Sequence, residues 1–216
     1  MEIRSENAAS AWKQALRAIR EHGTDFIDEN ANQCREILNM TITLTNPATV
    51  MGPLITMKST DKWHYPSPEE IRSIIMDPEP GTFAYTYGSR LFAYEEGFNQ
   101  IDDFIVPLLK ATPHSRRAVI TIWNPIQDEN IESRAVPGMV LCDLKLRSGK
   151  LHITAIVRSA DIFFGWPANT YQISLIQSTI AERLGVANGH LTTFCTSAHI
   201  FSYQYEDIDV IIDEER

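Results

Sequence analysis

The chain has 216 residues, of which 44% are hydrophobic and 22% are charged, so it can bury one sizeable core and we expect a single domain over residues 1–216. The formal net charge of −9 would repel a polyphosphate backbone, which argues against nucleic acid as a partner. Any anionic ligand must therefore be held by a local cluster of arginines.

The amino-terminal part of the chain predicts one helix, one strand and a long irregular stretch. Apolar residues recur at helical spacing over residues 5–22, and Gly23 follows as a stop signal. Residues 36–46 are rich in Ile and Thr and end before a proline, which predicts a strand. The proline-rich stretch that follows, to about Thr82, leaves room only for a short helix over residues 69–76.

The rest of the chain alternates between helices and strands, which indicates an α/β fold. A helix is predicted over residues 98–110, and Asn169 or Thr170 would cap another helix that Gly185 closes. The acidic end, residues 207–216, is predicted as an edge strand followed by a frayed tail. Further strands are predicted over residues 118–123, 140–146, 151–157 and 191–201. The second and third of them form a hairpin, for which Arg147-Ser148-Gly149-Lys150 supplies the turn.

Two clusters of side chains have the chemistry to bind a phosphorylated ligand. Arg116 and Arg117 precede a predicted strand, and each guanidinium can donate two hydrogen bonds to phosphate oxygens. Arg158 and Ser159 follow the hairpin, and Asn169 offers the donor and acceptor that read the edge of a base. From the residues alone, a solvated basic pair and a structural ion pair beside a helix cap stay open as alternatives.

Four motifs carry a resemblance to a known enzyme family. They are SRRAVITIWNP, PGMVLCDLKLRSGKL, RSADIFFGWPAN and SAHIF. In this order and at these separations they closely resemble the successive motifs of thymidylate synthases, most tightly over residues 113–203, and the AWKQALRAIREHG opening resembles the compact archaeal-type members. The resemblance implies an α/β domain with a mixed β-sheet and flanking helices, and a homodimer that pairs through the sheet.

The resemblance assigns a role to each matching phosphate-binding position. In the family, the arginines that match Arg116 and Arg117 reach across the dimer interface to the partner's nucleotide phosphate. The residues that match Arg158 and Ser159 hold the same phosphate from within the subunit. Asn169 matches the asparagine that reads the uracil edge. The implied substrate is a pyrimidine nucleotide monophosphate.

Three further matches concern the sugar and the movement of protons. His199 matches a histidine bonded to the sugar hydroxyl, and Tyr87 matches a tyrosine near the reacting carbon. Asp161 matches an aspartate that works on the folate side and its water network. The implied cofactor is 5,10-methylenetetrahydrofolate or a tetrahydromethanopterin analogue.

The nucleophile of the family is missing from this chain. In the family's Pro-Cys-His signature the cysteine thiolate adds to carbon 6 of uracil and makes carbon 5 nucleophilic. The aligned triplet here is Pro137-Gly138-Met139, so this covalent route cannot operate at position 138. Three explanations stay open: a route that uses another nucleophile or direct addition to the acceptor, an introduced Cys-to-Gly substitution, or a descendant that binds nucleotides without turnover.

The three cysteines of the chain do not replace the missing thiol. Cys142 lies four residues further along the predicted strand, about 13 Å from position 138 at a rise of ~3.3 Å per residue. Cys195 is expected to be a buried structural thiol. An odd count at wide spacing, together with Cys34, favours a reducing, cytoplasmic compartment. No apolar run reaches the ~20 residues that span a bilayer, so no membrane partner is expected, and no metal ion is expected either.

Other departures from the family pattern bear on the substrate. Phe201 stands in place of the tyrosine that would bind the sugar hydroxyl with the histidine, and Val157 replaces a glutamine. No arginine matches the early phosphate loop near residues 28–30, although Arg35 is a candidate substitute. The acidic carboxyl terminus would make a poor lid over the cofactor, and the wetter site would favour hydroxymethyl transfer, which water completes.

These observations predict one-carbon transfer, as methyl or hydroxymethyl, from a reduced pterin to carbon 5 of a pyrimidine nucleotide or a related acceptor. Two alternatives stay open, a nucleotide-binding protein without turnover and an enzyme that acts on a non-nucleotide acceptor.

Overall fold

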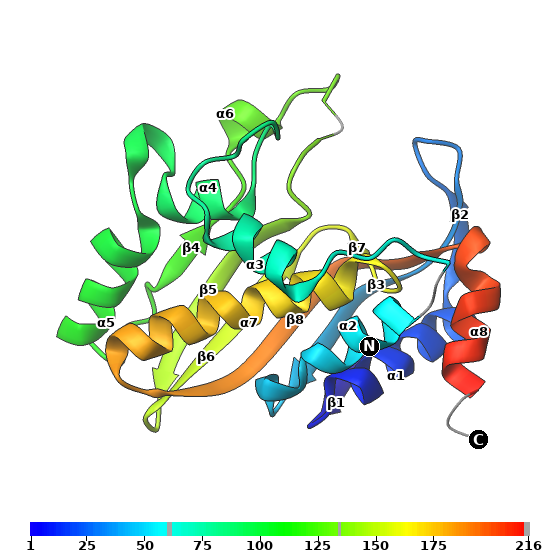
Figure 1. The fold of residues 1–216 in the computed structure, drawn as a ribbon, viewed down its shortest axis with the longest axis horizontal. Helices are drawn as coiled ribbons and strands as arrows, with labels where there is room; N and C mark the ends of the chain where they lie inside the picture. Colours follow the sequence, from blue (N-terminus) through cyan, green and yellow to red (C-terminus); the bar gives the residue numbers. More distant parts are fainter. Residues whose placement is uncertain (60–61, 134, 214–216) are drawn as a thin grey trace.

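A mixed β-sheet organises the computed structural model, which describes residues 1–59, 62–133 and 135–213 (Figure 1). Within these residues eight strands form one sheet in the order β1-β3-β8-β6-β5-β4, with β2 paired to β3 and β7 paired to β8. The strands are β1 (Glu2–Ser5), β2 (Thr24–Ile27), β3 (Gln33–Leu44), β4 (Val119–Thr121), β5 (Met139–Arg147), β6 (Lys150–Val157), β7 (Ala160–Asp161) and β8 (Ala187–Phe201). Strands β6 and β7 run parallel to β8, whereas β3 runs antiparallel to it. The predicted mixed α/β fold is confirmed.

The helices lie against this sheet and at its ends, and Figure 1 shows α7 lying along β6 and β8. They are α1 (Ala8–His22), α2 (Met51–Ser59), α3 (Pro68–Met76), α4 (Tyr87–Phe92), α5 (Val106–Ala111), α6 (Pro125–Asp128), α7 (Gly165–Leu184) and α8 (Tyr205–Asp213). Shorter helical turns are η1 (Pro47–Thr49), η2 (Glu95–Gly97), η3 (Gln100–Ile105) and η4 (Ser202–Gln204).

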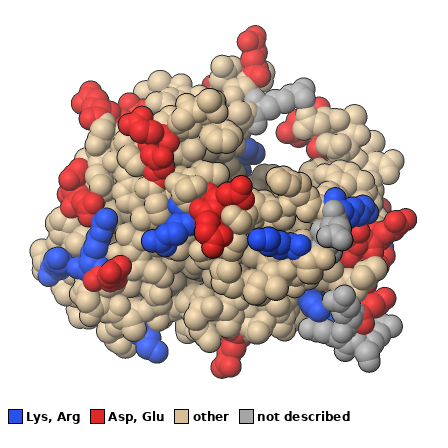
Figure 2. Space-filling model, viewed as in Figure 1, with Lys and Arg blue, Asp and Glu red and all other residues tan. Residues whose placement is uncertain are grey.

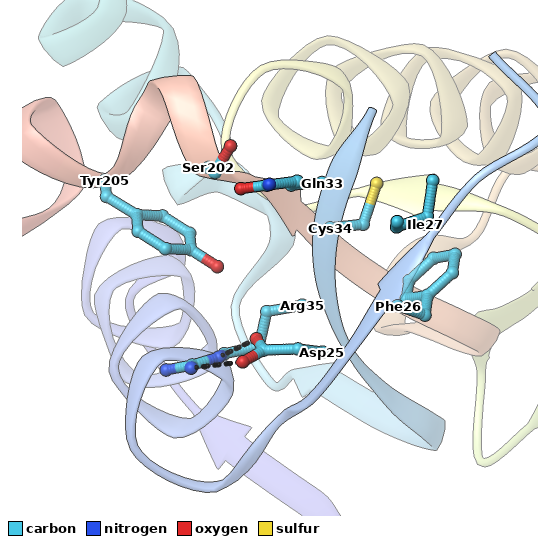
Figure 3. A pocket seen from close by; sticks show the side chains of 8 residues that line it. All are labelled: Asp25, Phe26, Ile27, Gln33, Cys34, Arg35, Ser202 and Tyr205. Carbon is cyan, nitrogen blue, oxygen red and sulfur yellow. Dashed lines mark hydrogen bonds and ion pairs between the residues drawn. The ribbon is translucent and has the colours of Figure 1, made fainter. Parts of the chain in front are cut away.

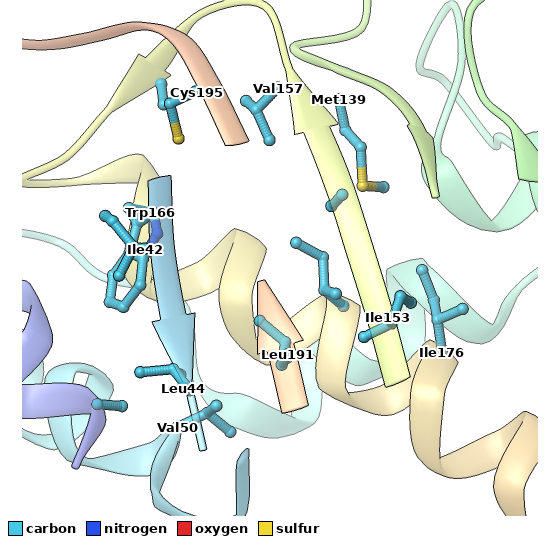
Figure 4. Packing of buried hydrophobic residues seen from close by; sticks show 14 of the residues in the cluster. Ile42, Leu44, Val50, Met139, Ile153, Val157, Trp166, Ile176, Leu191 and Cys195 are labelled. Atoms are coloured by element: carbon cyan, nitrogen blue, oxygen red, sulfur yellow. The ribbon is translucent and has the colours of Figure 1, made fainter. Parts of the chain in front are cut away.

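The core fills the space between the helices and one face of the sheet (Figure 4). Along β6, Leu151, Ile153 and Ala155 are buried, whereas the alternate residues Thr154 and Ile156 stay half-buried on the opposite face. Strand β8 shows the same alternation. A strand alternates its side chains between faces, so this pattern gives the sheet one helix-covered face and one partly open face.

The hairpin of the sequence prediction is confirmed. Residues Arg147 and Lys150 pair directly across a two-residue turn. Ser148 and Gly149 both adopt positive φ angles, of 49° and 71°. This geometry matches the right-handed twist of the flanking strands and requires turn residues that tolerate it.

The predicted start of α7 at Asn169 or Thr170 is wrong, because the helix begins at Gly165. Pro167 lies in its first turn, where a missing N–H removes no helical hydrogen bond. The cap comes from a distant residue: the Tyr65 hydroxyl donates to the Phe164 carbonyl at 2.8 Å and accepts from the Ala168 amide at 3.0 Å. Asn169 is therefore not a cap.

The predicted carboxyl-terminal edge strand is also wrong, because residues 205–213 form α8. Ile208, Ile211 and Ile212 are buried and Val210 is 62% exposed, which is a helical period rather than strand alternation. The segment packs on α1, where Arg20 and Asp209 pair through two hydrogen bonds of 2.8 Å. The predicted frayed tail at residues 214–216 lies outside the described residues.

Two helical segments differ from their predictions. The stretch after Pro47, predicted as irregular apart from one short helix, also contains α2, with Pro53 in its first turn. The helix predicted over residues 98–110 is divided into the wide turn η3 and α5, and Pro107 lies at the start of α5. A proline cannot donate the hydrogen bond that would continue one regular helix through this point.

Candidate functional site

Position 138 lies where three predicted site residues meet. A Cβ atom built on Gly138 would lie 3.2 Å from the Ser159 carbonyl oxygen and 3.8 Å from the Tyr87 hydroxyl. The Arg158 amide donates to the Gly138 carbonyl at 2.8 Å. The place that a side chain at position 138 would occupy thus adjoins the Tyr87 hydroxyl and the backbone of Arg158 and Ser159.

Tyr87 is held at this point by the start of α4. Thr86 caps that helix and exchanges hydrogen bonds of 3.0 and 3.1 Å with Ser89. Gly88 is required next to it, because a Cβ there would lie 2.2 Å from the Asp77 carbonyl oxygen. The Tyr87 hydroxyl accepts from the Met139 amide at 3.3 Å, and burial raises its pKa to about 12. Tyr87 is therefore a neutral phenol at physiological pH, able to donate a hydrogen bond.

Arg158 braces the loop that leads to Gly138. Its Nε donates to the Pro137 carbonyl at 2.9 Å and its Nη2 to the Val136 carbonyl at 3.3 Å. The guanidinium lies 5.6 Å from the centre of the Trp123 ring. The side chain is exposed, so a ligand can reach it, but two of its donor groups already support the loop.

Asp161 and His199 lie opposite each other on β7 and β8. The Asp161 Oδ1 accepts from the amides of Phe163 and Phe164, both at 3.0 Å, and its Oδ2 accepts from the Gln204 amide at 3.0 Å. Burial raises the pKa of Asp161, and the backbone hydrogen bond from Phe164 opposes that shift. His199 is 8% exposed, and its buried Nδ1 has no hydrogen-bond partner among the described residues.

A small cavity joins Tyr87 to Asn169. It has a volume of about 250 Å³ and is lined by Ile74, Phe83, Tyr85, Thr86, Tyr87, Asn169 and Gln172. A Cβ built on Gly165 would lie 3.6 Å from the Asp161 Cβ and 4.0 Å from the Asn169 Nδ2. Gly165 therefore lies between Asp161 and Asn169. Because Asn169 also lines the cavity that Tyr87 lines, it lies between Tyr87 and the Asp161 region.

Arg116 and Arg117 lie apart from this group in the single chain. Both side chains are exposed ahead of β4, the last strand at one end of the sheet. Neither guanidinium forms a hydrogen bond or ion pair within the described residues. Their role in a partner's site stays a prediction.

Arg35, the candidate substitute for the missing phosphate-loop arginine, is engaged elsewhere. Its guanidinium pairs with Asp25 at 2.6 and 2.9 Å (Figure 3). It also donates to the Arg20 carbonyl at 2.8 Å. It lines a surface cavity of about 400 Å³ beside Tyr205. In this structure Arg35 fastens the β2–β3 hairpin rather than the candidate site.

The three thiols are buried and poorly suited to attack. Burial raises the pKa of Cys34 to about 11 and those of Cys142 and Cys195 to about 12. The Cys142 sulfur contacts the Met139 sulfur at 3.6 Å. Since the thiolate is the attacking species, none of these cysteines is activated, and the predicted burial of Cys195 is confirmed.

Sequence reasoning missed Tyr65 and Gln204. Both reach the site from distant segments, and no local pattern marks them.

Figure 2 shows acidic and basic side chains interspersed on one face of the molecule, without a continuous basic surface. Among the described residues, no three His, Cys, Asp or Glu side chains are grouped to hold a metal ion. No helix in the described ranges has the length and apolar content to span a bilayer.

Comparison with known proteins identifies the family. The sequence model of the thymidylate synthase family matches residues 10–216. A putative thymidylate synthase of Methanosarcina acetivorans is 34% identical over 210 residues, which cover 97% of this chain and 94% of that protein. One from Methanothermobacter thermautotrophicus is 31% identical over 220 residues, with 97% of each chain covered. Through this match along nearly its whole length, the chain belongs to the thymidylate synthase family.

Proposed function

We propose that this protein transfers a one-carbon unit, as methyl or hydroxymethyl, from a methylene-tetrahydropterin to carbon 5 of a pyrimidine nucleotide, without a thiol at position 138. The convergence of Tyr87, Arg158 and Ser159 around Gly138 carries the proposal. Family membership supports methyl transfer to a pyrimidine nucleotide. The identity of the acceptor, the identity of the product and a reaction without a thiol at position 138 go beyond what family membership supports, and they are part of this proposal.

The residues present fit the proposed ligands. His199 lies opposite Asp161, and its imidazole is proposed to bond the sugar hydroxyl, which requires its buried ring to become accessible when the nucleotide binds. Asn169 can read the edge of a pyrimidine, and Phe83 and Tyr85 give the adjoining cavity aromatic walls suited to a flat heterocycle. A reduced pterin, 5,10-methylenetetrahydrofolate or its tetrahydromethanopterin analogue, supplies the one-carbon unit when it is bound.

We propose that carbon 5 of the acceptor adds directly to the one-carbon unit, because the part of the chain that the structure describes offers no activated nucleophile in place of the missing thiol. The cysteines are buried with raised pKa values, and a Tyr87 pKa of about 12 keeps its phenol protonated. In this route carbon 5 would bond to the one-carbon unit as the unit's bonds to the pterin nitrogens break, with water supplying the oxygen of a hydroxymethyl product. Tyr87 would donate a hydrogen bond beside the reacting carbon, and Asp161 would accept the proton that carbon 5 releases, directly or through water. Hydroxymethyl transfer suits the site, since water rather than hydride completes it.

The proposal also assigns the phosphate to both subunits of a homodimer. Arg158 and Ser159 would hold it from within one subunit, and the exposed Arg116 and Arg117 of the partner copy would complete the site. Their free guanidinium groups in the single chain support this assignment.

Tritium release tests turnover. Uracil and cytosine nucleotides labelled with tritium at carbon 5 are incubated with the protein, with and without methylenetetrahydropterin. Release that depends on the pterin is the expected result, and Asp161→Asn should abolish most of it. Absence of release with every nucleotide and pterin would contradict the enzymatic proposal.

Nucleotide affinity separates the alternative, a binding protein without turnover, which the glycine at position 138 favours. Arg158→Ala should weaken binding about 10- to 100-fold through loss of charged hydrogen bonds, whereas Arg4→Ala, an exposed arginine on β1, should not. Binding without tritium release would support that alternative. Absence of any nucleotide binding would favour a non-nucleotide acceptor.

A further inference from the structure

The side chain of Gln204 connects the carboxyl-terminal segment to the candidate site. Gln204 is 1% exposed in η4, the turn between β8 and α8. Its Nε2 donates to the Asp161 Oδ2 at 3.0 Å, and its Oε1 accepts from the Phe201 amide at 2.9 Å. The two partners fix the amide orientation, since an amide N–H needs an acceptor and a carboxylate needs a donor.

In each of its three hydrogen bonds among the described residues, the Asp161 carboxylate is the acceptor. Oδ1 accepts from two backbone amides and Oδ2 from Gln204, so three of about four acceptor positions of the carboxylate are used. The remaining position is available to a ligand or a water molecule. Donors of this kind favour the ionised form of a carboxyl group, whereas burial disfavours it. Gln204 supplies the one side-chain donor that Asp161 has among the described residues.

Gln204 is also coupled to the packing of α8. The turn η4 continues directly into α8, which is fastened to α1 by Arg20 and Asp209. Asp207 on the same helix accepts from the Trp63 Nε1 at 3.2 Å. A displacement of α8 would therefore move the amide that holds Asp161.

We propose that Gln204 is a positioning residue that orients Asp161 for proton transfer and favours its ionised form against the effect of burial, and that it thereby couples α8 to the candidate site. This inference rests on the proposed function, in which Asp161 accepts a proton. The acidic segment predicted to be a poor lid follows shortly after Gln204 and would thus act on the site through the packing of α8 instead of by closure.

Several titratable groups face Asp161 from the surrounding elements, and a pH experiment must separate them. They are His199 on β8, Cys34 on β3, Tyr65 on the loop before α3, and Tyr203 in η4. A histidine is the group of this set that ordinarily changes charge between about pH 5 and 8. The Asp161 carboxyl must therefore be followed directly, by ¹³C NMR, with its resonance assigned through its absence in Asp161→Asn.

The test compares Gln204→Glu with Ser202→Ala in the full chain. Gln204→Glu keeps an acceptor for the Phe201 amide but replaces the donor to Asp161 by a second carboxyl oxygen. The Asp161 resonance should then titrate about one to two pH units higher. In a plot of the tritium-release rate against pH, the acid limb should move to higher pH by the same amount. Ser202→Ala, in the same turn, should leave both unchanged.

The outcomes distinguish this inference from the proposed function. An Asp161 titration that is identical in Gln204→Glu and wild type overturns the inference. A shifted titration with an unmoved acid limb also overturns it, because the reaction would not use the Asp161 charge. If the resonance shifts while even the wild type releases no tritium, the proposed function fails and the Gln204–Asp161 coupling stands.

If Gln204→Glu does not fold, a measurement on the wild-type protein tests the same inference. In the wild type, protonation of Asp161 should loosen η4, so amide hydrogen exchange in α8 should accelerate with the midpoint of the Asp161 titration. Exchange in α8 that is independent of this midpoint overturns the inference.

Discussion

The glycine at position 138 is not required by the backbone. Its φ angle lies outside the positive region, unlike those of Gly149 and Gly185. The nearest atom to an added Cβ is 3.2 Å away, whereas at Gly88 it is 2.2 Å away. A side chain at position 138 needs a small shift of the Ser159 carbonyl and no change of fold. The absence of a side chain at position 138 therefore does not follow from the fold.

The variant Gly138→Cys should fold and acquire a reactive thiol. We expect its free energy of unfolding to lie within about 1 kcal/mol of wild type, and Gly138→Ala to match it, since both add one Cβ. Mass spectrometry should detect a covalent adduct with a pyrimidine nucleotide in Gly138→Cys and none in Gly138→Ala. Collapse of both variants on thermal unfolding would show that the glycine is structural.

Within the sheet, a histidine secures an irregular junction between β6 and β8. Residues Gly189 and His190 lie opposite His152, where the register shifts. The His152 Nδ1 accepts from the His190 amide at 3.0 Å, and a Cβ on Gly189 would lie 2.7 Å from this ring. From α7, the Gln177 amide donates to the Leu151 carbonyl at 2.7 Å. This bulge is held from both faces of the sheet.

The junction should make stability depend on pH. Burial, followed by the charges of His190, Lys150 and Arg147, lowers the pKa of His152, so the folded state keeps the ring neutral where the unfolded chain is already protonated. A lowered histidine pKa contributes stability above the unfolded value, about 6.5, that is lost as pH falls. The free energy of unfolding, measured in denaturant at one protein concentration, should therefore decrease below about pH 6.5.

The matched variant His152→Asn keeps an acceptor oxygen for the His190 amide and cannot titrate. Its unfolding free energy should vary less with pH than that of wild type. His22→Asn, on an exposed side chain at the end of α1, should retain the wild-type dependence. Equal slopes in wild type and His152→Asn would assign the pH dependence to another group.

For the whole molecule, the partly open face of the sheet and the free arginines ahead of β4 both favour a homodimer. Thr154 and Ile156 on β6, and Thr192 and Phe194 on β8, stay half-buried on this face. A second copy would cover them and bring Arg116 toward the partner's Arg158. We therefore expect a solution mass of twice the 24.5 kDa chain.

Mixing two variants tests the shared site. The double variant Arg116→Ala with Arg117→Ala and the single variant Arg158→Ala should each bind nucleotide weakly. Hybrid dimers of the two contain one intact site, so their binding capacity should recover to about half that of wild type. A monomeric mass, or hybrids that bind no better than the parent variants, would contradict a site built from two subunits.

Much of the candidate site could be predicted because its residues lie in contiguous motifs. Gly138, Arg158 and Ser159 follow from those motifs and Tyr87 from a looser match, and the structure brings the four together. Arg35 was misjudged, because nothing local indicates that its guanidinium pairs with Asp25. The position of Arg116 relative to the rest depends on a second subunit.

The sequence by itself determined the family, the β5–β6 hairpin, the absent nucleophile and the existence of α1, predicted over residues 5–22 and found over Ala8–His22, since each depends on neighbours along the chain. Only the tertiary structure decided where α7 begins, that the carboxyl-terminal segment is helical, and what holds Asp161. Tyr65 caps α7 across 99 residues, and Gln204 reaches Asp161 across 43. Contacts at such separations leave no periodic signal in the sequence, because they depend on how the sheet and helices pack.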